Sequence, residues 1–272
     1  MIFRQVEDPD DPAVSDYIGL RDPDLRISVE APGGIGTPHG RFITEGALAL
    51  ERLLDSPYPI RSILVSESQA TKLADPLGTV PDGTPVLRAS QAVLNRIAGF
   101  NLHRGVLASA ERLPLASMRT LTFGASRILA LEGIVDHENM GGLFRNAAAF
   151  GVQAVILDRT CADPLYRRAV RVSLGHVLRV PFTRVVDWTG GLDQLRADGV
   201  RTLALTPTGS VPIGEIRRDK RPMALLLGSE GPGLTAATLA RVDERICIPM
   251  ADGVDSLNVA AAAAVALYAL SG

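Results

Sequence analysis

The sequence predicts an α/β protein of two domains, the second built on a mostly parallel sheet. Short, unbroken apolar runs separated by helical stretches recur through the second half, which is typical of parallel strands buried on both faces. The first half alternates smaller helical and extended segments. With 272 residues, 46% of them hydrophobic, and no visible repeat, the chain is long enough to form two ordered cores.

An acidic leader, residues 1–19, is expected before the first domain, and disorder is plausible only there. The first 30 residues hold eight acids against three arginines, a balance of −5, so the rest of the chain carries +3 within a net charge of −2. No basic segment followed by an apolar one opens the chain. The longest apolar run, 259–270, is too short and too rich in alanine to span a bilayer. The sequence therefore predicts a cytoplasmic protein without a membrane partner.

The first domain is predicted over residues 20–112 as a small α/β unit. Its expected elements follow from apolar spacing and cap residues: a helix at 45–54, strands at 60–65 and 85–87, a helix at 90–98 with Ser90 as its N-cap, and a strand at 105–108. A linker is expected over 113–126, where Pro114, Ser117 and Thr122 interrupt any clear periodicity.

The second domain is predicted over residues 127–272. Its buried parallel strands are expected at 128–131, 154–157, 202–205, 224–227 and 246–248. In parallel sheets with helices on both faces, ligands bind beyond the carboxyl ends of the strands. The segments that directly follow these strands are therefore the candidates for a functional site.

The segment after the first of these strands reads as a helix with one buried stripe, because apolar residues recur at i, i+3, i+4 and i+7 from Met140. Asn139 falls where an N-cap belongs, and Arg145 lies off the stripe, where it could face a ligand or a partner. A simple cap and a simple surface charge are the alternatives for these two residues.

Two later segments also follow strands. The sequence GSEGPG at 228–233 is a loop in which glycines let the backbone approach a ligand closely, and Glu230 could accept hydrogen bonds from it. A tight turn before a helix near Thr235 is the alternative. The segment 249–258 leads into an alanine-rich helix, for which Ser256 is a plausible N-cap, whereas capping does not account for Asn258.

Residues 159–184 hold six arginines and one acid, Asp163, which makes this segment the candidate for a surface facing RNA phosphates. A solvated helix face is the alternative. Two cysteines and four histidines without ligand spacing give no indication of a metal site, so no metal is expected.

Taken in order, the segments at 139–151, 228–234, and 248–250 with 256–259 resemble the three motifs of the SpoU RNA methyltransferases, the TrmH-like members of the SPOUT superfamily. The resemblance covers about residues 127–270. It implies a deep trefoil knot, which most folds avoid, a homodimer, and a pocket for S-adenosyl-L-methionine. The residues carried over to that pocket are Thr206, Gly228, Ile248 and Leu257.

The resemblance also implies the activity, methylation of a ribose 2′-hydroxyl in RNA. It assigns Arg145 to the hydroxyl, where the residue is sometimes described as a general base. Because arginine is almost never neutral in a protein, we expect Arg145 instead to orient the target phosphate and stabilise the developing alkoxide. The side chains implied to shape the pocket around it are Asn139, Glu230, Ser256 and Asn258.

Residues 40–110 are similar to the RNA-binding domain that precedes the catalytic domain in ribosomal-RNA members, although His103-Arg104-Gly105 stands where relatives often have His-Gln-Gly. Ribosomal RNA is therefore the expected substrate. Methylation of transfer RNA and a non-catalytic RNA-binding role are the alternatives. A nucleotide-dependent enzyme is disfavoured, because the chain has no phosphate-binding loop or dinucleotide fingerprint.

Overall fold

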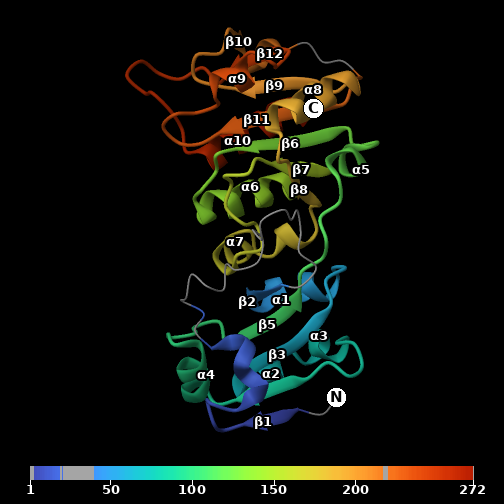
Figure 1. Ribbon diagram of the computed structural model, residues 1–272. Coiled ribbons are helices and arrows are strands. Elements are labelled where there is room, and N and C mark those ends of the chain that lie inside the picture. The colour runs from blue at the N-terminus through green and yellow to red at the C-terminus, as the bar shows by residue number, and fades with distance from the viewer. Residues whose placement is uncertain (1–2, 19, 21–39, 217–219, 272) are drawn as a thin grey trace. The chain divides into compact units, whose positions relative to one another are not determined.

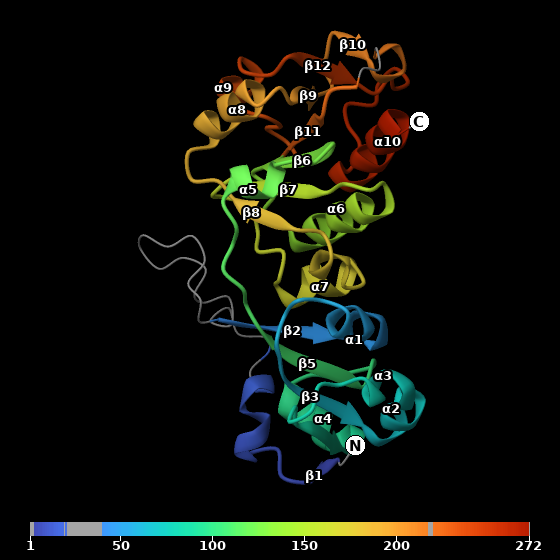
Figure 2. The same ribbon diagram turned by 90° about the vertical axis from the view of Figure 1, so that its right-hand side faces the viewer.

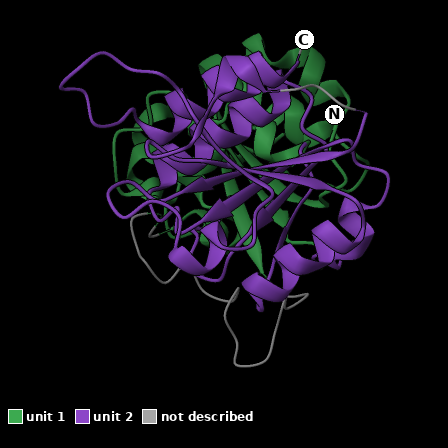
Figure 3. Ribbon diagram, turned by 90° about the horizontal axis from the view of Figure 1, so that it is seen from above, with its two compact units in different colours: residues 1–114, 165–179 green, residues 115–164, 180–272 purple. Residues whose placement is uncertain are grey.

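The computed structural model describes residues 3–18, 20, 40–216 and 220–271 (Figure 1). The chain forms two compact units. Unit 1 comprises Met1–Pro114 and Leu165–Arg179, and unit 2 comprises Leu115–Pro164 and Val180–Gly272 (Figure 3). The predicted first domain includes residues 21–39, which lie outside the described residues. The segment 165–179, which the sequence places in the second domain, belongs to unit 1 instead.

Unit 1 is built on a five-stranded sheet, in which β2 pairs antiparallel with β5, β5 pairs antiparallel with β3, and the remaining pairs are parallel. In spatial order the strands are β1 (Arg4–Val6), β4 (Val86–Ala89), β3 (Ile60–Ser66), β5 (Val106–Glu111) and β2 (Arg41–Glu45). Its helices include α1 (Ala47–Leu54), α2 (Glu67–Lys72), α3 (Ala74–Gly78) and α4 (Gln91–Ala98). The predicted cap of α4 is confirmed, because Ser90 accepts from the backbone N–H of Val93.

The acidic N-terminal segment is part of this unit and not a separate leader. Strand β1 joins the sheet, and a short 3₁₀ helix, η1 (Pro12–Tyr17), packs on the same core as α4. The side chains of Val6, Val14 and Tyr17 are buried there. Three of the acids that lie between these apolar residues, Glu7, Asp8 and Asp10, are exposed. The overall charge of the segment therefore does not reveal that its apolar residues are packed.

Asp16 connects η1 to the sheet through hydrogen bonds and ion pairs. Its carboxylate accepts hydrogen bonds from the Ser109 hydroxyl at 2.7 Å and the Arg61 guanidinium at 3.0 Å, and Arg41 lies 3.3 Å away. Burial raises the pKa of Asp16, but the hydrogen bonds from Ser109 and Arg61 and the charges of Arg41 and Arg61 outweigh it, so the pKa lies below the ordinary 3.8. The ionised carboxylate therefore stabilises the fold.

We expect Asp16→Asn to lower the free energy of unfolding by about 2 kcal/mol at neutral pH, because charge-assisted hydrogen bonds are lost. A lowered pKa contributes stability above pH 3.8, and this contribution disappears as the pH falls through the folded-state value. The difference between variant and wild type should therefore shrink below about pH 4. Urea unfolding at several pH values measures it; a difference independent of pH would contradict the assignment.

The segment 165–179 contains α7 (Arg167–Val172) and a short 3₁₀ helix, η3 (His176–Leu178). Arg167 forms an ion pair with the buried Glu45 at 2.6 Å and stacks over the ring of Phe100 at 4.6 Å. Arg179 pairs with Asp55 at 2.5 Å. Two arginines of the predicted phosphate-facing segment therefore stabilise unit 1.

A third arginine of that segment has a structural role within unit 2. Arg184 Nη1 donates to the backbone carbonyls of Asp158, Arg159 and Cys161 at 2.8–3.1 Å. The predicted phosphate-facing surface is therefore not formed by all six arginines. Intramolecular acceptors, which the sequence cannot locate, engage three of them.

Unit 2 is built on a seven-stranded sheet in which every pair of neighbouring strands is parallel. In spatial order the strands are β10 (Val211–Pro212), β12 (Glu244–Cys247), β9 (Arg201–Leu205), β11 (Met223–Gly228), β6 (Arg127–Glu132), β7 (Ala154–Leu157) and β8 (Phe182–Arg184). The predicted mostly parallel sheet is confirmed. The predicted trefoil knot stays a prediction.

Helices cover both faces of this sheet (Figure 2). One face carries α5 (Met118–Thr122), α8 (Trp188–Ala197) and α9 (Ala236–Leu239), and the other carries α6 (His137–Ala149) and α10 (Val259–Ser271). A short 3₁₀ helix, η4 (Ile213–Glu215), follows β10. Helix α5 falls within the predicted linker, with Thr122 buried, so part of 113–126 belongs to the packed unit.

No helix in the described part of the chain is both long and apolar enough to cross a membrane.

Candidate functional site

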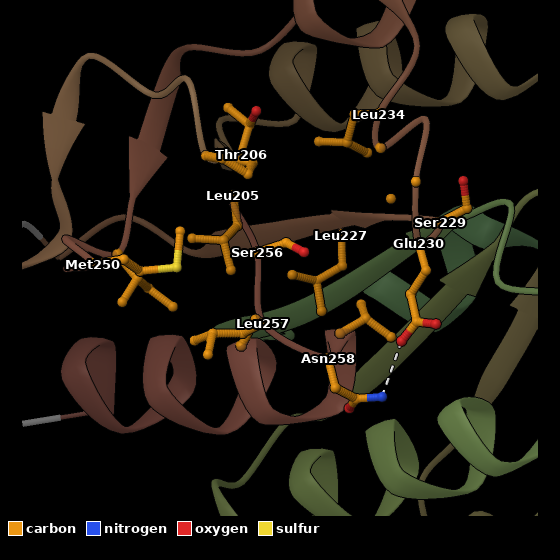
Figure 4. Close-up of a pocket in the computed structure, with 17 residues that line it drawn as sticks. Leu205, Thr206, Leu227, Ser229, Glu230, Leu234, Met250, Ser256, Leu257 and Asn258 are labelled. Carbon is orange, nitrogen blue, oxygen red and sulfur yellow. Dashed lines mark hydrogen bonds between the residues drawn. The ribbon is translucent and has the colours of Figure 1, made fainter. Parts of the chain in front are cut away.

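A pocket of about 460 Å³ opens at the carboxyl ends of three neighbouring strands of unit 2, β9, β11 and β12 (Figure 4). It is formed by the segments that follow these strands. Residues lining it are Leu205, Thr206, Pro207, Leu227, Gly228, Ser229, Glu230, Gly231, Gly233, Leu234, Ile248, Met250, Ser256, Leu257, Asn258, Val259 and Ala262. The volume lies within the roughly 300–1,000 Å³ typical of small-molecule sites.

The structure brings seven of the nine predicted site residues to this pocket. The four residues predicted to hold the cofactor are Thr206, Gly228, Ile248 and Leu257. The other three are Glu230, Ser256 and Asn258. Sequence reasoning missed the apolar wall, to which Leu205, Leu227 and Met250 contribute. The signal was available, because Leu205 and Leu227 end predicted strands and Met250 lies two residues beyond one.

The glycine loop forms one side of the pocket. The backbone N–H of Gly233 donates to the carbonyl of Ser229 at 3.1 Å, which closes residues 229–233 into a tight turn. Gly231 and Gly233 have φ angles of +89° and +71°, which side chains other than glycine rarely adopt. The loop is therefore a tight turn and also forms a wall of the pocket. The two alternatives that its sequence left open, a ligand-binding loop and a tight turn, are compatible.

Gly228 is required at the start of this loop. A Cβ atom there would lie 2.2 Å from the backbone carbon of Gly233 and 2.3 Å from the nitrogen of Leu234. The two ends of the loop can approach this closely only because residue 228 has no side chain. A bound ligand would meet the same exposed backbone.

We expect Gly228→Ala to weaken cofactor binding at least about tenfold, because the loop must shift by more than an ångström to admit the methyl group, and overpacking of this kind costs about 1–3 kcal/mol. Isothermal calorimetry measures the effect. Gly214→Ala is the matched control, since a Cβ there has no heavy atom within 4 Å. Equal affinities for the two variants would argue against the close approach.

Asn258 joins the pocket to helix α6. Its side-chain amide donates to Asn139 Oδ1 at 2.8 Å and to Glu230 Oε1 at 2.9 Å (Figure 4 shows the second bond). Its own oxygen accepts from the backbone N–H groups of Ala260 and Ala261. Asn258 is therefore the N-cap of α10 and also holds two polar side chains in place.

Two predicted caps are wrong. Ser256 does not cap α10, because Asn258 stands directly before the helix and accepts from its first turn. Asn139 does not cap α6, because Asp136 accepts from the backbone N–H groups of Glu138 and Asn139. The observed cap of α6 lies three residues before the predicted one, and the observed cap of α10 lies two residues after it. The side chains of Ser256 and Asn139 are thus available for other contacts.

Helices α6 and α10 pack closely enough for Asn139 to contact Asn258 at the edge of the pocket. The side-chain amide of Asn146 donates to the carbonyl of Ala260 at 2.6 Å, and a Cβ on Gly142 would lie 2.9 Å from that of Ala260. Arg145, on the same helix α6, is exposed and does not line the pocket. Of the nine predicted residues, seven line the pocket, Asn139 contacts one of these seven, and Arg145 lies apart.

The pocket suits a ligand that is partly apolar and partly polar. Leucine, isoleucine and methionine side chains line one part, whereas the backbone of the glycine loop and the hydroxyls of Thr206 and Ser256 offer hydrogen bonds. This combination fits the adenosine and amino-acid parts of S-adenosylmethionine. Within the described part of the chain, no group of three or more His, Cys, Asp or Glu side chains could hold a metal ion.

Comparison with known proteins supports this interpretation of the pocket. The model of the SpoU rRNA Methylase family matches residues 126–268, which include every loop of the pocket. This chain belongs to the SpoU rRNA methylase family. An uncharacterised tRNA/rRNA methyltransferase of Mycobacterium tuberculosis is 45% identical over 97% of this chain and 90% of its own length.

Two further relatives of this SpoU family member have more specific names. RlmP of Bacillus subtilis, a 23S rRNA (guanosine(2553)-2′-O)-methyltransferase, is 28% identical over 87% of this chain and 90% of its own length. The crystal structure of an AdoMet-bound rRNA methyltransferase from Sinorhizobium meliloti superposes with a TM-score of 0.81 at 25% identity, covering 98% of this chain and 97% of the other. Both matches extend over unit 1 as well as the methylase unit.

Proposed function

We propose that this SpoU family member methylates a ribose 2′-hydroxyl of ribosomal RNA. The chain is an RNA methyltransferase, and S-adenosylmethionine is its methyl donor. The observation that carries the proposal is the pocket at the ends of β9, β11 and β12, which gathers seven of the residues implied by the three motifs. The relative from B. subtilis, named for 2′-O-methylation of 23S rRNA, supports the choice of hydroxyl and substrate.

The predicted cofactor residues would hold S-adenosylmethionine, which supplies an electrophilic methyl group when bound. Gly228 lets the backbone approach it, and Leu257 and Ile248 offer apolar surface. Asn258 fixes Glu230 and Asn139 beside the pocket, so that these groups are oriented before the RNA arrives. Among the residues that the structure describes, Glu230 is the only one with a charged side chain that lines the pocket.

A cation is needed to orient the RNA and to stabilise the negative charge that develops on the attacking oxygen. We assign this role to Arg145, a permanently charged group with five N–H donors. Because Arg145 lies outside the pocket of its own chain, we propose that it acts on the pocket of a second copy. Exposed apolar side chains on α10, Val265 at 43% and Tyr268 at 74%, support a homodimer.

Unit 1 is proposed to bind the RNA. Arg104 lies against Gly46 and is exposed, as is His103 beside it. These residues lie within 40–110, the segment that is similar to the RNA-binding domain of ribosomal-RNA methyltransferases. We also propose a cytoplasmic location, where ribosomal RNA is accessible, and a trefoil knot in unit 2.

The test is methylation by the purified protein with S-adenosylmethionine labelled in its methyl group. Ribosomal RNA and transfer RNA are compared as acceptors, using RNA from a strain that lacks the enzyme, and the labelled nucleotide is mapped by its resistance to alkaline hydrolysis. We expect label at a ribose of ribosomal RNA. Label in transfer RNA would support that alternative, and cofactor binding without any transfer would support a non-catalytic RNA-binding role.

A further inference from the structure

A buried carboxylate lies at the end of the strand next to the glycine loop. Glu132 is the last residue of β6, and its partner in the parallel pairing with β11 is Gly228, the first residue of the loop. Only 7% of Glu132 is exposed, and it does not line the pocket. Burying a carboxylate costs free energy unless hydrogen bonds compensate, so its partners indicate its role.

Both oxygens of Glu132 bind the residue at which the glycine loop ends. Oε1 accepts from the hydroxyl of Thr235 at 2.8 Å, and Oε2 accepts from the backbone N–H of Thr235 at 3.2 Å. Thr235 follows Leu234, the last residue of the loop that lines the pocket, and it is the N-cap of α9. Glu132 therefore fixes the point at which the chain leaves the pocket.

Further hydrogen bonds connect Thr235 to helices α9 and α8. The hydroxyls of Thr235 and Thr238 lie 3.1 Å apart, and the indole N–H of Trp188 on α8 donates to Thr238 at 3.0 Å. Thr238 is completely buried. The exit of the loop is thus tied to β6, α9 and α8, whereas the loop itself holds three glycines and has little stiffness of its own.

We propose that Glu132 is a positioning residue for the methyl donor, which keeps the glycine loop in its binding shape through Thr235. A loop that is ordered before binding loses less conformational entropy when the ligand arrives. The inference rests on the proposed function, because it concerns the same pocket. The ligand that it affects is S-adenosylmethionine and not the RNA.

Glu132→Gln tests the proposal, because the amide keeps the size of the side chain but offers only one acceptor oxygen. With its oxygen on the backbone N–H, the amide would donate to the Thr235 hydroxyl, so the buried site loses its charged acceptor. We expect the dissociation constant and KM for S-adenosylmethionine to rise about tenfold, since a hydrogen bond to a charged group contributes more than one to a neutral group. The value of kcat at saturating cofactor should stay within about twofold, because the reacting groups are unchanged.

Thr235 provides a second and milder test. Thr235→Val removes the hydroxyl donor and should raise the same KM by a few-fold, whereas Thr235→Ser retains the hydroxyl and should restore the wild-type value. This pair decides the question if Glu132→Gln does not fold. Equal KM values for the Val and Ser variants would overturn the proposal.

Glu244→Gln is the matched control for a loss of stability. Glu244 pairs with the buried Arg201 at 2.5 Å at the opposite, amino end of the same sheet. This variant should lower the melting temperature but leave the KM for S-adenosylmethionine unchanged. A wild-type affinity in Glu132→Gln, with an active wild-type enzyme, would overturn the positioning role alone. A wild-type protein without methyl transfer would overturn the proposed function instead.

Discussion

Replacing Arg145 by alanine should abolish most methyl transfer while leaving S-adenosylmethionine binding intact. We expect kcat to fall about 100- to 1,000-fold, the usual effect of removing one donor that stabilises a developing oxyanion. The dissociation constant of the cofactor should change less than about twofold, because Arg145 does not line the pocket. Single-turnover methylation of RNA and calorimetry with the cofactor measure the two quantities.

Two further variants sharpen this prediction. Arg145→Lys keeps the positive charge but loses the planar guanidinium, so it should recover only part of the rate. Arg119→Ala, which removes another exposed arginine of unit 2 from helix α5, should leave the rate unchanged. Near-normal transfer by Arg145→Ala would show that the arginine has no role in the reaction.

Asn258→Asp should separate the two roles of this residue. Aspartate remains a good N-cap for α10 and favours the positive end of the helix dipole, so the melting temperature should change little. The two N–H donors to Glu230 and Asn139 are lost, and a second carboxylate is placed beside Glu230. We expect kcat/KM for S-adenosylmethionine to fall about 100-fold, which corresponds to about 2.7 kcal/mol.

Asn258→Ser distinguishes the lost donors from the added charge. Serine also caps the helix but is neutral and too short to bridge both partners, so its defect should be smaller than that of the aspartate variant. Thermal unfolding followed by circular dichroism checks that the cap is retained in both. A wild-type kcat/KM in the aspartate variant would show that the network around Asn258 does not shape the pocket.

Much of unit 2 could be predicted from local sequence. Five of its seven parallel strands were visible as short apolar runs, and the observed bounds of these five differ from the predicted ones by at most two residues. The short edge strand β8 and the two-residue strand β10 were not predicted. The rule that ligands bind beyond the carboxyl ends of parallel strands directed attention to the segments 228–233 and 249–258, and the resemblance to the SpoU motifs added Thr206 and Ile248. These residues lie at the pocket.

Caps and surface charges could not be predicted in the same way. Several polar residues near a helix start are equally plausible caps by type, and the choice of Asp136 over Asn139, or Asn258 over Ser256, depends on where the backbone turns. The arginines of 159–184 look alike in sequence. Their partners lie at unrelated distances along the chain, 122 residues away for Arg167 and Glu45 but 23–26 residues away for the carbonyls that Arg184 contacts.

The sequence by itself determined the fold class and five of the seven parallel strands of unit 2, because strands buried on both faces are unbroken runs of apolar residues. The order of the three motifs, through their resemblance to the SpoU family, indicated the segments that line the pocket. Only the tertiary structure decided which side chains meet. Asn258 and Asn139 are 119 residues apart, and Glu132 and Thr235 are 103 apart. Such pairs follow from the spatial order of strands and from helix packing, which no local pattern specifies, so the network around the methyl donor emerges only in the folded protein.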